Sequence, residues 1–162
     1  MPPERLRALE RCCRLLLEAS RVLGATTWYS EQYPKGLGPT VAGLRAPLQA
    51  CGARRVEKVC FSVADGAGVT AALQESGADT VIVTGMETHV CVFQTVRDLR
   101  ALGLRVHVPI DGVCSRRDDH RAAGLKLCEQ VGAVTTTAET IVFDWLREAG
   151  TDAFRQLSPL IR

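Results

Sequence analysis

Residues 79–92 read DTVIVTGMETHVCV, which is an apolar run followed by Gly85, a short turn and the start of an amphipathic segment. A short apolar run bounded by turn signals is typical of a strand buried on both faces of a parallel sheet. The next segment, from His89 to Leu102, has helical spacing and ends at Gly103. The stretch therefore predicts a strand, a tight turn and a helix, with Cys91 in the first turn of that helix.

The position of Cys91 favours a chemical role. Backbone N–H groups at a helix start have no partner within the helix, and the helix dipole is positive there, so a thiolate at this point is stabilised. Considered alone, a cysteine is more simply interpreted as a small core hydrophobe. Its place directly after the strand and turn makes Cys91 a candidate nucleophile.

The rest of the chain alternates between strand and helix patterns. We expect strands at 26–30, 56–61, 79–84, 105–110 and 133–136, helices at 4–22, 69–75, 89–102, 117–131 and 138–149, and a Pro/Gly loop within 31–40. Strands that alternate with helices indicate βαβ units and a parallel sheet with helices on both faces. The prediction is a three-layer αβα, Rossmann-like fold, with all 162 residues in one domain.

Composition limits the class of protein. A formal net charge of +2 argues against a nucleic-acid partner. The apolar runs are far shorter than the roughly 18 residues that a membrane span needs. The seven cysteines form an odd set without C-x-x-C pairs, and no hydrophobic leader is apparent. We therefore expect a cytoplasmic protein with free thiols and no membrane partner.

Candidate site residues follow several of the predicted strands. Glu31 follows the first, Lys58 lies near the second, Glu87 and Cys91 follow the third, and Asp111 follows the fourth. Ligands of open parallel sheets bind at the carboxyl ends of the strands. These side chains are therefore expected to share one edge of the sheet.

Several of these segments resemble one known family. The stretches 85–92, 57–62 and 111–116 look like the isochorismatase-like cysteine hydrolases. The loop 30–40 resembles the branch called isochorismatase domain-containing proteins nearly throughout, and 137–161 is similar to that branch's closing helix. The resemblance covers almost the whole chain, with the motifs in the same order.

The resemblance implies a Cys–Lys–Asp triad. Carried over to this sequence, Cys91 is the nucleophile and Lys58 is the ammonium group that holds the thiolate and the aspartate. The family also has a cis peptide bond, here Met86–Glu87, and an oxyanion hole formed by the N–H groups of Glu87 and Cys91. Two such donors stabilise a tetrahedral oxyanion.

The family also implies a substrate class and an assembly. Its members hydrolyse amides such as nicotinamide or carbamoyl compounds, or the vinyl ether of isochorismate, without an organic cofactor. For this chain we expect a small amide-like or carbonyl substrate. Members commonly form dimers or tetramers, and we expect a homo-oligomer here.

One departure from the family concerns the aspartate. In the family it ends an N-terminal strand, whereas this sequence opens in the loop that should follow that strand. The strand would be central, between 26–30 and 79–84, so we expect a sheet that lacks its first, central strand. The flanking strands could close on each other, another segment could fill the gap, or the gene product could start upstream of Met1, which we favour.

The incomplete triad leaves more than one function open. We expect weak or no hydrolase activity from this exact sequence. The alternative is a non-catalytic pseudoenzyme of the same fold that acts as an assembly or interaction protein. A redox sensor based on Cys91 is a third, weaker option.

Other residues are assigned to the pocket or to local structure. Glu31, Tyr33, Phe61 and His89 are candidate pocket residues. His89 precedes Cys91 by two positions, so on a helix the two side chains point apart. It should therefore line the pocket mouth or cap the turn rather than serve as the base. Ser115 and Asp118 are expected to cap the helix at 117–131, and Cys60, Cys114 and Cys128 to lie in the core.

No metal is expected. Nicotinamidase members of the family carry an Asp-x-His metal site after the second strand, and residues 28–40 contain no His. A zinc site built from Cys60, Cys91, Cys114 and His89 matches no familiar ligand spacing. We therefore also expect a substrate other than nicotinamide.

Overall fold

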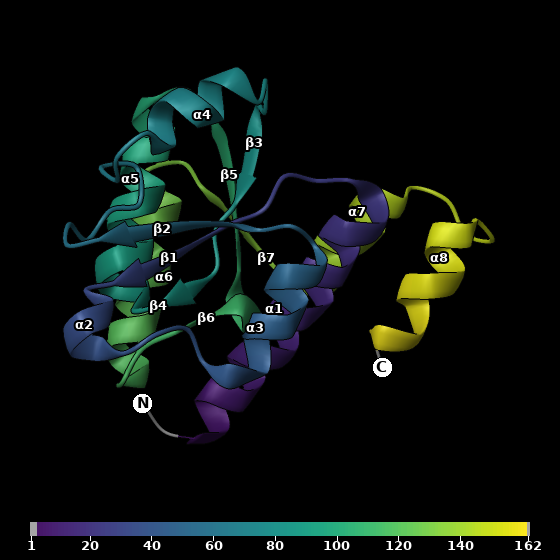
Figure 1. Cartoon of the computed structure of the whole chain (residues 1–162), viewed down its shortest axis with the longest axis horizontal. Helices are drawn as coiled ribbons and strands as arrows, with labels where there is room; N and C mark the ends of the chain where they lie inside the picture. The colour runs from purple at the N-terminus through teal and green to yellow at the C-terminus, as the bar shows by residue number, and fades with distance from the viewer. Residues whose placement is uncertain (1–2, 162) are drawn as a thin grey trace.

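The computed structural model describes residues 3–161 (Figure 1). In chain order the α-helices are α1 (Pro3–Leu23), α2 (Pro34–Leu37), α3 (Ala42–Ala50), α4 (Val69–Glu75), α5 (Phe93–Ala101), α6 (Asp118–Gln130), α7 (Ala138–Leu146) and α8 (Asp152–Leu157). The strands are β1 (Trp28–Gln32), β2 (Arg54–Lys58), β3 (Thr80–Ile82), β4 (Gly85–Met86), β5 (Arg105–Pro109), β6 (Val113–Cys114) and β7 (Val134–Thr136). A π-helical turn, η1 (Thr88–Val92), leads into α5, and two 3-10 turns are η2 (Ile110–Gly112) and η3 (Ser158–Leu160).

All strand pairs are parallel. They form three groups, β1–β2, β3–β5–β7 and β4–β6. Gln32 at the end of β1 is opposite Lys58 at the end of β2, so these two residues lie at the same end of the β1–β2 ladder. The predicted parallel α/β fold is confirmed.

Helices cover both faces of β3. Val81 and Val83 pack against a cluster that includes Val96 of α5 and Cys128 of α6. Ile82 points to the opposite face and packs against a cluster formed by α1, α7 and α8. Successive strand residues face opposite sides, and each side has its own helical layer. This alternation produces the three-layer arrangement.

The sheet does not close where a central strand was expected to be missing. β1 pairs only with β2 and β3 only with β5, and within residues 3–161 no ladder joins β1 to β3. Closure of the flanking strands on each other therefore does not occur. Val81 and Ile82 are half-buried, which corrects the prediction of a strand buried on both faces. The reason is that β3 has a neighbouring strand on one edge only.

Several boundaries differ from the sequence prediction. The second strand covers Arg54–Lys58, so the apolar residues up to Phe61 lie beyond its end. The predicted helix at 138–149 stops at Leu146, because Arg147 and Gly150 both adopt positive φ, and α8 then follows as a separate helix. The helix α2 lies within the expected loop, and α3 was not expected. Among residues 3–161, none of the helices has both the length and the apolar character to cross a lipid bilayer.

Candidate functional site

Cys91 lies on a π-helical turn between β4 and α5. The turn η1 covers Thr88–Val92 and follows the cis peptide bond Met86–Glu87, which confirms the bond implied by the family resemblance. The carbonyl of Glu87 accepts hydrogen bonds from Val90 N–H (3.1 Å) and Val92 N–H (3.2 Å). Short π-helical segments are frequent at functional sites. The helix predicted from His89 thus begins with this wider turn and becomes α-helical only at Phe93.

Two residues outside the turn hold it in place. Ser115 follows β6 and is fully buried, and its Oγ accepts a hydrogen bond from Thr88 N–H at 3.1 Å. Gly124 of α6 lies directly against the turn. A Cβ at Gly124 would be 2.7 Å from the backbone nitrogen of His89 and from the carbonyl carbon of Thr88. The glycine therefore allows α6 to approach the turn that carries Cys91.

A polar cluster surrounds the start of the turn. Glu87 Oε1 forms an ion pair with Arg116 Nε at 2.5 Å, and Glu87 Oε2 lies 3.6 Å from His89 Nδ1. The same ring nitrogen lies 3.1 Å from Ser115 Oγ. The ring of His89 is 4.5 Å from that of His120 on α6. His89 is therefore turned toward β6 and α6.

Lys58 is a buried ammonium group at the end of β2, with an exposed fraction of 7%. Its Nζ donates to Gln32 Oε1 (2.6 Å), to the carbonyl of Cys60 (3.1 Å) and to the carbonyl of Phe61 (2.8 Å). A lysine has three N–H donors, so all three are engaged and none is directed at Cys91. Among residues 3–161, no carboxylate forms an ion pair with Lys58.

The lysine shapes the loop that follows β2. Because its ammonium group binds the carbonyls of Cys60 and Phe61, the chain turns back after Val59. Val59 is 78% exposed and Phe61 is 52% exposed. Tyr33 is also exposed, and its N–H donates to the carbonyl of Lys58 at 2.9 Å. The two proposed aromatic pocket residues therefore flank Lys58.

Glu31 has a different position from the one expected of a pocket residue. It lies within β1, is 7% exposed, and accepts hydrogen bonds from Thr40 N–H and Thr40 Oγ1 (both 2.7 Å) and from Arg55 Nε (2.8 Å). The two bonds from Thr40, together with Arg55, lower the pKa of the Glu31 carboxyl from 4.5 to about 2. These contacts fasten the loop 33–40 to the sheet and leave Glu31 no evident role in binding a substrate.

The seven thiols differ in environment. Burial raises the pKa of Cys12 and Cys13, and burial together with Glu87 raises that of Cys114. Burial also raises the pKa of Cys128 to about 11. Cys91 is half-buried, as are Cys51 and Cys60. The core positions expected for Cys114 and Cys128 are confirmed, whereas Cys60 is partly exposed.

The predicted helix caps on α6 are wrong. The N-cap of α6 is Arg117, without a side-chain cap. Ser115 instead bonds to Thr88 and His89, and Asp118 pairs with Arg5 of α1 at 2.6 Å. Each side chain bonds to a partner that is distant in the sequence instead of to the first N–H groups of α6. Internal Gly124 was the one sequence signal that could have indicated the close contact between α6 and the turn, since a glycine inside a helix often has a packing reason.

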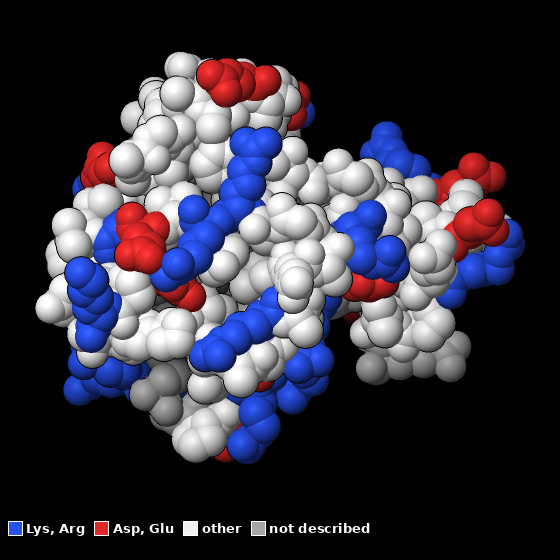
Figure 2. All heavy atoms as spheres, in the orientation of Figure 1, with Lys and Arg blue, Asp and Glu red and all other residues white. Residues whose placement is uncertain are grey.

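No cation site is evident in the part of the chain that the structure describes, because residues 3–161 contain no group of three His, Cys, Asp or Glu side chains placed to hold a metal ion. A hollow of about 500 Å³ is lined by residues such as Gly24, Thr27 and Arg54, at the amino ends of β1 and β2. It is thus separate from the turn that bears Cys91. On the face shown in Figure 2, Lys and Arg groups occur with Asp and Glu groups among them.

Comparison with known proteins identifies the family. The family model described as Isochorismatase domain matches residues 2–140. Isochorismatase domain-containing protein 2 of Bos taurus is 36% identical over 151 residues, which are 91% of this chain and 70% of the relative. Isochorismatase domain-containing protein 1 of Salmo salar is 35% identical, over 91% of this chain and 51% of the relative.

Solved structures agree with this assignment. A protein named MAR1 ribonuclease from Caenorhabditis elegans superimposes with a TM-score of 0.89 at 36% identity, over 96% of this chain and 79% of that one. The YcaC gene product of Escherichia coli, named an octameric hydrolase of unknown specificity, gives a TM-score of 0.87 at 20% identity, over 99% of this chain and 77% of that one. The second likeness concerns the fold alone. The sequence match and the shared fold together show that the chain belongs to the isochorismatase domain family.

Proposed function

We propose that the protein is a cysteine hydrolase that acts on a small amide-like or carbonyl substrate through Cys91. The observation that carries the proposal is the turn itself. Cys91 is half-buried on a π-helical turn at the start of α5, and Ser115 and Gly124 hold that turn against two other elements. A thiol at such a helix start can react as a thiolate.

The reaction that fits this placement is acyl transfer. Cys91 Sγ would form a bond to the substrate carbonyl carbon, and the resulting oxyanion would be received by the N–H groups of Glu87 and Cys91. Collapse of the adduct breaks the C–N bond, and the amine leaves with the proton that the Cys91 thiol gave up on attack. Water then hydrolyses the thioester, releases the carboxylic acid and restores the thiol. No organic cofactor and no metal enters these steps.

Lys58 would act by charge and by position. In this chain its ammonium group binds three neutral oxygens at the carboxyl ends of β1 and β2. Its direct contribution is therefore to hold the loop that presents Phe61, next to Tyr33. These two aromatic side chains are the proposed pocket wall.

The proposed chemistry needs a proton acceptor beside Cys91. The resemblance assigns it to an aspartate, and within residues 3–161 Lys58 has no carboxylate partner. For that reason we expect weak or no turnover from this sequence alone. The same observation favours the second candidate, a pseudoenzyme that keeps the fold as an assembly protein.

The two candidates are separated by turnover with matched variants. The assay measures hydrolysis of small amides, carbamoyl compounds and thioesters by the wild type, by Cys91→Ser and by Cys51→Ser, whose thiol is also half-buried. A hydrolase loses its activity, and its acyl adduct in mass spectrometry, only in Cys91→Ser. Equal residual rates in all three proteins, with no adduct on Cys91, would support the pseudoenzyme instead.

Assembly and location are part of the same proposal. We propose a cytoplasmic homo-oligomer, a dimer or tetramer, and no nucleic-acid partner. Exposed apolar side chains support the oligomer, because Leu37 is 72% exposed and Val59 is 78% exposed. Light scattering of the purified chain tests it, and a strictly monomeric mass at micromolar concentration contradicts it.

A further inference from the structure

The hydroxyl of Ser115 links the Cys91 turn to His89. Its Oγ accepts a hydrogen bond from Thr88 N–H at 3.1 Å and lies 3.1 Å from His89 Nδ1. Ser115 is fully buried. A serine hydroxyl carries one proton, and His89 Nδ1 is the acceptor that these contacts offer it. Neutral His89 should therefore carry its own proton on Nε2.

A second partner for the same nitrogen lies nearby. Glu87 Oε2 is 3.6 Å from His89 Nδ1, and it is a buried oxygen without a hydrogen-bond partner within residues 3–161. The other carboxylate oxygen, Oε1, is held by Arg116 at 2.5 Å. A protonated imidazole has N–H groups on both ring nitrogens. Once His89 is charged, its Nδ1–H can donate to Glu87 Oε2 and can no longer accept the proton of Ser115.

The change of partner at His89 affects the backbone hydrogen bonds of the turn that carries Cys91. Glu87 provides the carbonyl that accepts from Val90 and Val92, the two residues that flank Cys91. Ser115 binds the N–H of Thr88, the first residue of the turn. Both alternative partners of His89 are thus direct supports of the turn.

The charged and titratable groups around His89 come from four elements. They are Glu87 on its own turn, Cys114 of β6 and Arg116 after it, His120 of α6 at 4.5 Å between ring centroids, and Arg5 of α1, which binds the carbonyls of Ser115 and Arg116. Two imidazolium rings this close would repel each other.

We propose that His89 is a positioning residue that couples the shape of the Cys91 turn to pH. When His89 is neutral, its Nδ1 accepts a hydrogen bond from the Ser115 hydroxyl. When it is protonated by solvent, its Nδ1–H donates a hydrogen bond to Glu87 Oε2 instead. The consequence for catalysis rests on the proposed function of Cys91.

The first test is the tautomer of His89, read from ¹⁵N chemical shifts of the imidazole nitrogens. The wild type should show Nε2–H for neutral His89, and Ser115→Ala should give a mixture of the two tautomers. His107 of β5 is the internal reference and should not change. A neutral Nδ1–H form in the wild type would overturn the proposal.

The second test is the alkylation rate of Cys91 by iodoacetamide as a function of pH. Asn at position 89 can accept the Ser115 hydroxyl but does not titrate, so His89→Asn keeps the contact and removes the charge change. The ratio of wild-type to His89→Asn rates should change about fivefold between pH 5 and 8, as expected for one hydrogen bond of roughly 1 kcal/mol. The control is His107→Asn, for which the ratio of wild-type to variant alkylation rates should not change with pH.

A flat ratio for His89→Asn would also overturn the proposal. Neither test requires hydrolysis of a substrate. If Cys91 proves no more reactive than Cys51, the proposed hydrolase fails, yet the tautomer and the pH dependence still decide the role of His89.

Discussion

The contact between Gly124 and the Cys91 turn predicts a costly substitution, Gly124→Ala. The added Cβ would lie 2.7 Å from His89 N and 2.8 Å from its Cα, and backbone atoms at that distance must move by several tenths of an ångström. Overpacking of this kind costs roughly 1–3 kcal/mol, while Ala in a helix regains about 1 kcal/mol over Gly. The difference is a net loss of up to about 2 kcal/mol in the free energy of unfolding.

The same displacement should lower the alkylation rate of Cys91, because the whole turn shifts away from α6. Gly43→Ala is the matched control, since its Cβ would meet the far ends of the Glu10 and Arg14 side chains of α1. Those side chains can move, so Gly43→Ala should not lower the free energy of unfolding. Urea unfolding and iodoacetamide labelling measure both effects. Wild-type stability together with wild-type labelling in Gly124→Ala would show that the contact with α6 does not constrain the Cys91 turn.

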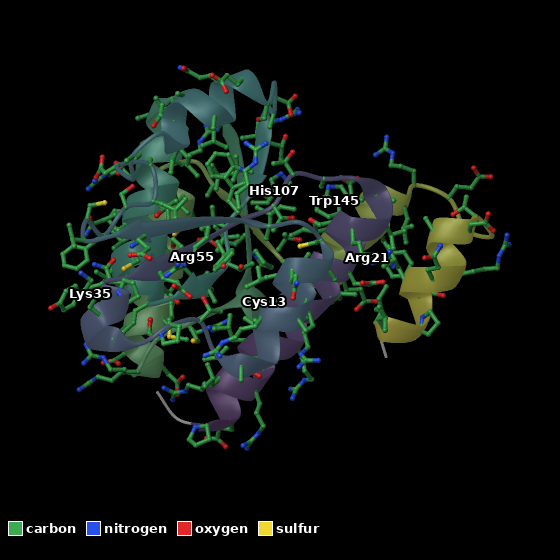
Figure 3. All side chains as sticks on the ribbon, viewed as in Figure 1. Cys13, Arg21, Lys35, Arg55, His107 and Trp145 are labelled. Carbon is green, nitrogen blue, oxygen red and sulfur yellow. The ribbon has the colours of Figure 1, made fainter. Side chains whose placement is uncertain are left out.

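Three further predictions concern other named contacts. The pKa of Glu31 is lowered from 4.5 to about 2, so the carboxylate contributes stability above about pH 4.5 that is lost as the pH falls toward 2. Glu31→Gln should reduce this pH-dependent change in the free energy of unfolding, measured by urea unfolding, by about 1 kcal/mol; the effect is modest because solvent screens the half-exposed Arg55. An unchanged pH dependence would contradict this prediction. Lys58→Met leaves three oxygens without this donor and should lower the free energy of unfolding in urea by roughly 2–3 kcal/mol. The control is Lys35→Met, on α2 at the edge of the molecule (Figure 3), which should cost almost nothing. Equal losses would disprove the role of the Lys58 ammonium group. Asp111 accepts the first backbone N–H of α7 at 2.9 Å, so Asp111→Ala should lower the thermal midpoint by the equivalent of about 1 kcal/mol, and an unaltered midpoint would contradict this.

The parallel fold could be predicted because its signals are local. Apolar runs at 79–84 and 105–110 alternate with amphipathic segments, and these periodicities determine strand and helix without reference to distant contacts. The turn between β4 and α5 also followed from Gly85, which adopts a φ of 122°. The family motif supplied the cis bond at Met86–Glu87, which no periodicity could have indicated.

The end of β2 illustrates what periodicity misses. Val59 and Phe61 have the apolar character of strand residues, yet both are exposed because Lys58 binds the carbonyls of Cys60 and Phe61 and turns the chain. A single-residue contact of this kind leaves no pattern in the sequence. The helix α3 was missed for a related reason, since Gly43 and Pro47 lie within it and lower its apparent helical propensity.

The supports of the candidate site were the hardest part to predict. Ser115 and Glu31 have the residue types of a cap and a pocket acid, and the sequence near each gave no reason to choose another role. Their actual partners, Thr88 with His89 and Thr40 with Arg55, come from other elements. Such partners depend on how the layers pack, which is a property of the whole chain.

The assignment of Cys91 as the nucleophile is tested by the relative rates at which iodoacetamide modifies the seven thiols at pH 7, measured by peptide mass spectrometry. Cys51 and Cys60 are the proper references because they are half-buried like Cys91. If the helix-start position activates the thiol, Cys91 should react at least about tenfold faster than either reference. Modification of Cys91 at or below the rates of Cys51 and Cys60 would contradict its assignment as the nucleophile.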